Sequence, residues 1–236
     1  MPEQPISILE KYWRYTSFRH PQEEIIDAVL HKKDVLALMP TGGGKSLCYQ
    51  IPALCMDGLC LVVTPLIALM RDQVENLSAR NIRAIAIHSG MSFIEVKKNL
   101  QNAIHGKYKL LYVSPERLFS QLFREFLRDL DVQLIAVDEA HCISQWGYDF
   151  RPSYLEIGAL RELLPGVNMI ALTASATPQV MDDIAEKLLF KNPEKFRATF
   201  ERPNISYSVF LAESKINKLL EILKNVPGSS IVYCKT

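Results

Sequence analysis

The sequence has few of the features that mark membrane, secreted or zinc-bound proteins. It contains no apolar run that approaches the roughly 18 residues of a transmembrane helix, and its N-terminus shows no basic segment followed by an apolar one. The five cysteines form no C-x-x-C pair, so the sequence predicts no zinc or redox motif. Their odd number and irregular spacing favour reduced thiols, buried as small hydrophobic residues. We therefore expect a cytoplasmic protein without a membrane partner, in the bacterial cytosol or nucleoid, or in the nucleus of a eukaryote.

The sequence also lacks a strong excess of charge of either sign, with a formal net charge of +1. This balance excludes a wholly basic nucleic-acid coat protein, but it allows an enzyme with a locally basic groove. Of its 236 residues, 48% are hydrophobic and 22% are charged, as in ordinary globular proteins. The length is sufficient for one large core and the start of a second.

Short apolar runs alternate with longer helical patterns along most of the chain. Most runs are continuous, as is typical of strands that are covered on both faces. The strands are predicted at Asp34–Met39, Leu59–Thr64, Arg83–Ile87, Leu110–Val113, Leu134–Val137 and Met169–Leu172. The helices are predicted at Ser46–Met56, Leu66–Arg80, Ser92–His105, Pro115–Leu127, Ser153–Leu163 and Pro178–Phe190. This alternation predicts an α/β fold over residues 1–198, a doubly wound parallel sheet flanked by helices.

A proline-containing break at Lys191–Asn204 separates this unit from the C-terminal residues. Beyond it, the pattern predicts a strand at Ile205–Phe210, a helix at Ser214–Asn225 and a strand at Ser229–Cys234. Residues 199–236 are therefore predicted to form a linker and the start of a second α/β domain, cut just after a strand of the buried type.

A glycine-rich segment at 39–46, M-P-T-G-G-G-K-S, follows a predicted strand and opens a helix. Glycines let backbone N–H groups curl around phosphate oxygens, and the helix N-terminus adds partial positive charge. Lys45 can reach the β- and γ-phosphates of ATP, and the Ser46 hydroxyl can ligate Mg²⁺. Met39 replaces the first glycine of the usual pattern, but the strand–loop–helix context is the required one. We predict ATP binding by Thr41, Gly42, Gly43, Gly44, Lys45 and Ser46.

A second motif, at 134–141, is an apolar run that ends in two carboxylates. In a parallel sheet the carboxyl ends of the strands line the ligand crevice. Asp138 is predicted to hold Mg²⁺, directly or through water. Glu139 is predicted to orient and deprotonate the attacking water.

Three segments resemble motifs I, II and III of superfamily-two helicases: the glycine-rich loop, the D-E-A-H run at 138–141 and L-T-A-S-A-T at 172–177. The resemblance implies that the third motif links a nucleotide site to a nucleic-acid site. Its hydroxyl residues here are Thr173, Ser175 and Thr177. The catalytic residues implied are Lys45, Asp138, Glu139 and His141.

Two further segments resemble RecQ-type DNA helicases. In residues 15–22, Y-T-S-F-R-H-P-Q, the resemblance implies that Gln22 pairs with the edge of adenine, since an amide both donates and accepts. Tyr15 and Arg19 would then stack on the base. Residues 142–152 resemble the family's aromatic-rich loop. In that family the loop senses single-stranded DNA and couples DNA binding to ATP hydrolysis. The residues implied in this role are Trp146, Phe150 and Arg151.

Residues 63–73 resemble motif Ia of the family and residues 112–118 resemble motif Ib. Each lies at a strand end that leads into a helix, where N–H groups and hydroxyls can hold DNA phosphates. The implied DNA-contacting residues are Pro65, Leu66, Ser114 and Arg117. His88 also ends a strand, but the sequence offers it no nearby partner, and it is assigned no role.

The resemblance covers almost the whole chain and implies a RecA-like fold with the start of a second RecA-like domain. It implies the motor domain of an ATP-dependent DNA helicase, of 3′–5′ polarity, that acts in DNA repair or recombination. It implies ATP and Mg²⁺ as cofactors and single-stranded and partly duplex DNA as partners. The family's arginine finger, zinc module and winged helix have no counterpart in these residues, so we expect this fragment alone to be inactive in unwinding.

Two alternatives remain open at this point. One is an RNA helicase of the same superfamily, which a comparison of ATPase stimulation by single-stranded DNA and RNA would distinguish. The other is a catalytically silent nucleic-acid-binding module. Lys45, Asp138 and Glu139 argue against silence, and measured turnover would decide.

Overall fold

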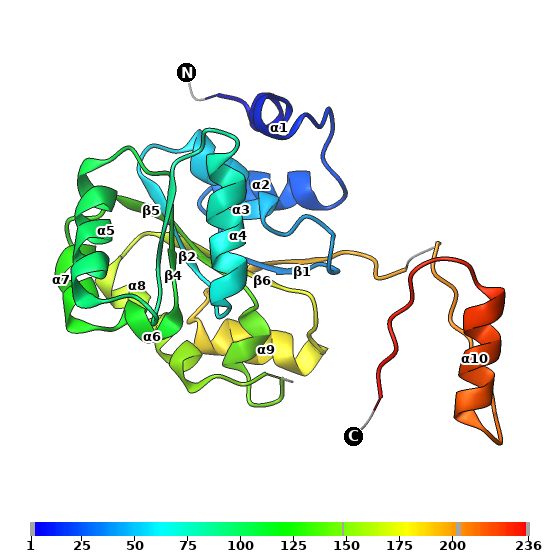
Figure 1. The fold of residues 1–236 in the computed structure, drawn as a ribbon. Coiled ribbons are helices and arrows are strands. Elements are labelled where there is room, and N and C mark those ends of the chain that lie inside the picture. The colour runs from blue at the N-terminus through cyan, green and yellow to red at the C-terminus, as the bar shows by residue number, and fades with distance from the viewer. Residues whose placement is uncertain (1–2, 148, 202–203, 235–236) are drawn as a thin grey trace. The chain divides into compact units, whose positions relative to one another are not determined.

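The structure is a computed structural model that describes residues 3–147, 149–201 and 204–234. The chain divides into two units, Met1–Phe200 and Glu201–Thr236, and each is described by itself (Figure 1).

The first unit is built on a seven-stranded parallel sheet with the strand order β3-β4-β2-β5-β6-β1-β7. The strands are β1 Val35–Leu38, β2 Leu59–Val63, β3 Ala84–Ile87, β4 Leu110–Val113, β5 Val132–Val137, β6 Asn168–Thr173 and β7 Glu194–Arg197. The predicted parallel sheet is confirmed. Every residue of β1, β2, β4 and β6 is buried, as the continuous apolar runs indicated.

Strand β7 was not predicted, because its sequence E-K-F-R is polar and mostly exposed. It adds to the edge of the sheet beside β1, and Glu194 N–H donates to Asp34 O at 2.8 Å. A polar edge strand carries little hydrophobic signal and is hard to distinguish from a loop.

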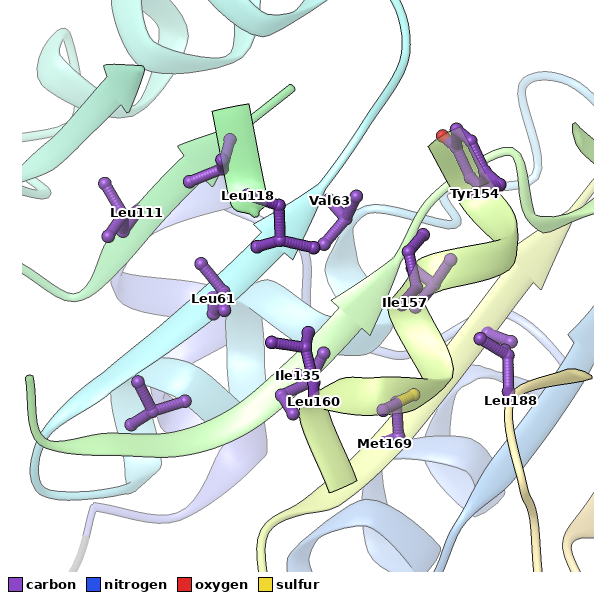
Figure 2. Packing of buried hydrophobic residues seen from close by; sticks show 14 of the residues in the cluster. Leu61, Val63, Leu111, Leu118, Ile135, Tyr154, Ile157, Leu160, Met169 and Leu188 are labelled. Atoms are coloured by element: carbon purple, nitrogen blue, oxygen red, sulfur yellow. The ribbon is translucent and has the colours of Figure 1, made fainter. Parts of the chain in front are cut away.

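Helices cover both faces of the sheet. Against one face lie α2 Gln22–Leu30, α3 Leu47–Cys55 and α4 Ile67–Ser78, whose buried residues pack on Val35, Val62 and Leu134. Against the other lie α5 Phe93–His105, α7 Gln121–Leu127, the 3₁₀ helix η2 Pro152–Ala159, α8 Leu160–Leu163 and α9 Pro178–Lys187. Figure 2 shows this second layer, where Ile157 of η2 and Leu160 of α8 belong to one cluster with Ile135 of β5. Successive side chains of a strand point to opposite faces of the sheet, so they pack against different helix layers.

The remaining helices of this unit are α1 Pro5–Trp13, α6 Pro115–Leu118 and the 3₁₀ turn η1 Ala140–Ile143. Helix α1, which was not predicted, buries Ile8 and Leu9 in a small cluster with Ile26 and Ile51.

Two predicted helices differ from the observed ones. The helix expected at Pro115–Leu127 is divided into α6 and α7, because the Ser120 hydroxyl accepts a hydrogen bond from Phe123 N–H and starts a new helix. The helix expected at Ser153–Leu163 begins as η2 and becomes α-helical only at Leu160.

The second unit contains α10 Lys215–Asn225, close to its predicted bounds, and Ser214 caps it by accepting from Asn217 N–H at 3.3 Å. The strands predicted at Ile205–Phe210 and Ser229–Cys234 were wrong for the described part of this unit. A strand needs a neighbour for its backbone groups, and residues 204–234 as described contain no paired strand. Their apolar side chains are largely exposed.

Candidate functional site

The predicted motifs converge because the strands are parallel. Every strand of the sheet ends at the same edge, so segments far apart in sequence become neighbours there. The segments at this edge are the loop 39–46 after β1, residues 64–66 after β2, 88–91 after β3, 114–117 after β4, 138–141 after β5 and 173–177 at the end of β6.

The glycine-rich loop turns tightly between β1 and α3. Gly42 and Gly44 have φ angles of 77° and 76°, a left-handed conformation that favours glycine. Gly43 N–H donates to Pro40 O at 3.0 Å, and Leu47 N–H donates to Gly44 O at 3.1 Å. The helix that carries Ser46 at its N-cap position therefore begins at the end of the loop.

The amide of Gln22 is bound to this loop. Its Nε2 donates to the carbonyl oxygens of Gly43 and Gly44, both at 3.2 Å, and its Oε1 accepts from Arg19 N–H at 2.9 Å. The Arg19 guanidinium also donates to Gly42 O at 3.3 Å. Gln22 is only 2% exposed. The structure thus brings together the two segments that the sequence assigned separately to base and phosphates.

A cavity of about 530 Å³ opens beside these contacts. Its walls include Tyr15, Arg19, Gln22, Gly44 and Leu47. Tyr15 is 52% exposed, so its ring is available to a ligand. An aromatic ring, a guanidinium and an amide around one cavity are groups that can stack on a planar base and hydrogen-bond to its edge.

The two carboxylates follow β5 directly. Asp138 N–H continues the strand ladder by donating to Val63 O at 2.9 Å, and Asp138 O accepts from the Tyr154 hydroxyl at 3.0 Å. Glu139 has a left-handed φ of 47°, and its N–H donates to Asp138 Oδ1 at 3.0 Å. Burial, and then the neighbouring Glu139 carboxylate, raise the pKa of Asp138 to about 6.

His141 joins this motif to the end of β6. Its Nδ1 lies 2.8 Å from Thr173 Oγ1 and 3.3 Å from Glu139 Oε2. Thr173 Oγ1 also accepts from Ser175 N–H at 3.2 Å. Thr177 stands apart from this network, because its hydroxyl caps α9 by accepting from Val180 N–H.

The aromatic segment after η1 presents Trp146, which is 70% exposed, while Phe150 is half-buried and Tyr148 lies outside the described residues. Arg151 anchors this segment. Its Nη2 and Nε donate to Asp149 Oδ2 at 3.0 and 3.1 Å, and its Nη1 donates to Pro65 O at 3.3 Å. The aromatic loop is therefore attached to the residues that follow β2.

The segments after β3 and β4 are joined by Arg117. Its guanidinium donates to the carbonyl oxygens of His88, Ser89 and Met91 at 3.3, 3.2 and 2.6 Å. Arg117 thus holds the turn at 88–91. Ser114, by contrast, is 1% exposed, so the structure does not bring this predicted contact to the surface.

His88 does have a neighbour, contrary to the interpretation from sequence. It is 6% exposed, and its Nε2 lies 3.5 Å from Arg71 Nη2 on α4. Burial and the nearby Arg71 and Arg117 lower the pKa of His88. The sequence could not indicate this contact, because α4 and the end of β3 meet only in the folded sheet.

The sequence assigned no role to Tyr154, Asp149 or Gln50, which hydrogen-bond to Asp138, Arg151 and Tyr112, respectively. Asp149 lies within the aromatic loop in sequence and Tyr154 lies just after it, which is the only signal that these two residues carry. Of the cysteines, Cys48, Cys60 and Cys142 are buried as expected, whereas Cys234 is exposed. Within the described residues, no helix has both the length and the apolar character needed to cross a bilayer.

The family model for DEAD/DEAH box helicases matches residues 19–184. The chain is 45% identical to the ATP-dependent DNA helicase RecQ of Haemophilus influenzae, over 98% of this chain and 38% of that protein. The RecQ protein of Bacillus subtilis is also 45% identical, over 98% of this chain and 39% of its own length. The ATP-dependent DNA helicase Q1 of Rattus norvegicus is 39% identical, over 96% of this chain and 39% of its own length. The chain thus spans well under half the length of these relatives.

Solved structures share the fold. A hypothetical ATP-dependent RNA helicase from Sulfolobus tokodaii aligns with a TM-score of 0.63 at 19% identity, over 82% of this chain and 56% of that one. The Pyrococcus furiosus Hef helicase domain aligns with a TM-score of 0.58 at 24% identity, over 76% of this chain and 37% of that one. The family match covers most of the first unit, including the loop, the carboxylates and the aromatic segment described above. The chain belongs to the DEAD/DEAH box helicase family.

Proposed function

We propose that this chain is the ATP-binding motor domain of an ATP-dependent DNA helicase, which couples hydrolysis to movement along single-stranded DNA. The observation that carries the proposal is the common edge of the sheet. There the phosphate-type loop, the carboxylate pair and an exposed tryptophan lie on connected segments. The similarity to proteins named as DNA helicases favours DNA over RNA. The polarity would be 3′–5′, and the context DNA repair or recombination.

Nucleotide binding is proposed for the loop and the cavity beside it. Residues Thr41 to Ser46 would surround the phosphates, with Lys45 at the β- and γ-phosphates. Tyr15 and Arg19 would stack on adenine. Gln22 would read the edge of the base, and this requires its amide to leave the carbonyl oxygens of Gly43 and Gly44. Base recognition and opening of the loop would therefore be one event.

A magnesium ion fits the oxygen donors at this edge. Mg²⁺ is commonly held by one or two protein oxygens, the substrate phosphates and waters. Ser46 offers a hydroxyl. Asp138 offers a partly buried carboxylate whose raised pKa marks the cost of its charge, a cost that a cation would offset. Bound Mg²⁺ would supply charge neutralisation at the phosphates. Glu139 would orient and deprotonate the attacking water, and His141 would hold Glu139 and Thr173 together.

DNA binding is proposed for the segments around the aromatic loop. Trp146 and Phe150 would stack on bases, and Arg151 would keep the loop attached to Pro65. Leu66, in the segment after β2, is exposed. Thr173 and Ser175 would connect this region to the carboxylates. Arg117 would act through the turn it holds rather than by direct contact.

The test is calorimetric titration of the protein with Mg–ATP, followed by ATPase assays with single-stranded DNA and with RNA. Lys45→Ala should abolish nucleotide binding. DNA should stimulate hydrolysis more than RNA does. Unchanged nucleotide affinity in Lys45→Ala would refute the nucleotide site, and stronger stimulation by RNA would refute the choice of DNA.

A further inference from the structure

A buried amide joins α3, which follows the proposed nucleotide-binding loop, to two elements at the proposed DNA-binding edge, α4 and β4. Gln50 lies in the first turn of α3, and its N–H donates to Ser46 O at 2.9 Å. Its side-chain Nε2 donates to Gln73 Oε1 at 2.9 Å and to the Tyr112 hydroxyl at 3.2 Å. Both protons of one amide are therefore used, each toward a different element.

The two partners lead to the segments that follow β2 and β4. Gln73 is on α4, which starts directly after Thr64-Pro65-Leu66. Tyr112 is on β4, which is followed by the segment 114–117. Tyr49 adds support, since its ring packs edge-on against that of Tyr112 and the two hydroxyls are 3.5 Å apart.

The bond between Gln50 and Tyr112 is shielded from solvent, since Gln50 is 4% exposed and Tyr112 is 1% exposed, whereas Gln73 is partly buried. Water cannot easily replace the bond to Tyr112 if it breaks, so a broken bond there leaves a buried polar group unpaired. If α3 moves relative to α4 or β4, one of the two bonds must be lost. The least costly response is for the three elements to move together.

We propose that Gln50 is a positioning residue that couples nucleotide binding at the glycine-rich loop to DNA binding at the edge of the sheet where β2 and β4 end. This inference rests on the proposed function and adds a residue that none of the helicase motifs identified in the sequence includes. Nucleotide that reshapes the loop shifts the start of α3, and Gln50 carries that shift to α4 and β4. Because coupling between binding sites is reciprocal, DNA affects nucleotide affinity by the same factor.

The experiment measures that coupling factor directly. A fluorescein-labelled oligothymidylate is titrated with the protein in the absence and in the presence of saturating Mg–ADP, and the ratio of the two dissociation constants is the coupling factor. Gln50→Met keeps the length of the side chain but removes both bonds. Tyr112→Phe removes a single hydroxyl and provides a milder test if Gln50→Met does not fold.

Asn168→Leu is the matched control. Asn168 is also a buried amide whose nitrogen donates twice, to Val29 O at 3.0 Å and Lys33 O at 3.1 Å, but at the opposite end of the sheet. It should lower stability without changing the coupling factor.

The expected result is a coupling factor different from one in the wild type. It should move toward one by about 2- to 30-fold in Gln50→Met and Tyr112→Phe, the range for mutations on coupling routes. Affinity for Mg–ADP alone should stay as in the wild type. The inference is overturned if both variants keep the wild-type factor, if Asn168→Leu changes it equally, or if the wild type shows no coupling. A wild type that binds no Mg–ADP would contradict the proposed function as well.

Discussion

Replacing Gly44 by alanine should destabilise the first unit by more than the backbone conformation of Gly44 alone requires. Gly44 has a φ of 76°, and a Cβ at this position would overlap Gln22 Nε2. A left-handed conformation costs an L-residue about 1–2 kcal/mol. Gln22 would also have to move and lose its bonds to Gly43 O and Gly44 O, each contributing about 0.5–1.5 kcal/mol.

These terms together give a loss of about 2–5 kcal/mol in the free energy of unfolding. Domains of this kind are stable by about 5–15 kcal/mol, so the variant should still fold. The assay is urea denaturation followed by circular dichroism. Gly166→Ala is the control, since Gly166 has a φ of 85° and none of the described residues lies within 4 Å of its Cβ position. Gly166→Ala should therefore lose only the free energy of unfolding that a left-handed backbone conformation costs an alanine.

A double-mutant cycle isolates the contact with Gln22. In a Gln22→Ala background, Gly44→Ala should cost only about as much as Gly166→Ala, because the amide that it displaces is absent. If Gly44→Ala costs no more than Gly166→Ala in the wild type, or if the two mutations are additive, Gln22 does not hold the loop as described.

Three further predictions concern the site. Glu139→Gln should bind Mg–ATP normally while the rate of single-turnover hydrolysis falls by about 10²- to 10⁴-fold, since a general base is lost. Hydrolysis at the wild-type rate would show that Glu139 is not the general base. Trp146→Ala should keep nucleotide affinity but weaken binding of single-stranded DNA by about 1–3 kcal/mol, measured by fluorescence anisotropy; unchanged DNA affinity would make Trp146 a packing residue. The lowered pKa of His88 means that the unfolded chain binds its proton more tightly. Wild-type stability should therefore fall as the pH drops through the ordinary histidine range near ~6.5. Urea titrations at several pH values should show a smaller fall in His88→Asn, and identical profiles would contradict this assignment.

The sequence by itself determined the sheet and the places where its strands end. Continuous apolar runs such as Leu59–Val63 predict strands covered on both faces, because a strand with one face in water would alternate apolar and polar residues. Since parallel strands end at one edge, the loop at 39–46 and the carboxylates at 138 and 139 had to meet there. The sequence was weakest where hydrophobic burial is small, as at β7.

The sequence could not predict whether the strand-like segments beyond the first unit pair with a neighbouring strand. Residues 205–210 carry a strand-like pattern, yet Val209 is 98% exposed and no strand forms there in the described residues. Local β propensity becomes a strand only when a neighbour accepts its hydrogen bonds. The helix at 215–225 formed as predicted, because a helix satisfies its backbone within itself.

Only the tertiary structure decided which polar groups engage one another. Arg151 meets Pro65 O across 86 positions in the sequence, and Gln50 meets Tyr112 across 62. Residue identity defines what a side chain can donate or accept. Hydrogen bonds need a short donor–acceptor distance, commonly about 3 Å, and a near-linear geometry. The packing of the helices on the sheet sets both. The motifs therefore indicated the chemistry of this edge, whereas the bonds of Gln22, Arg117 and Gln50 depend on how the elements pack.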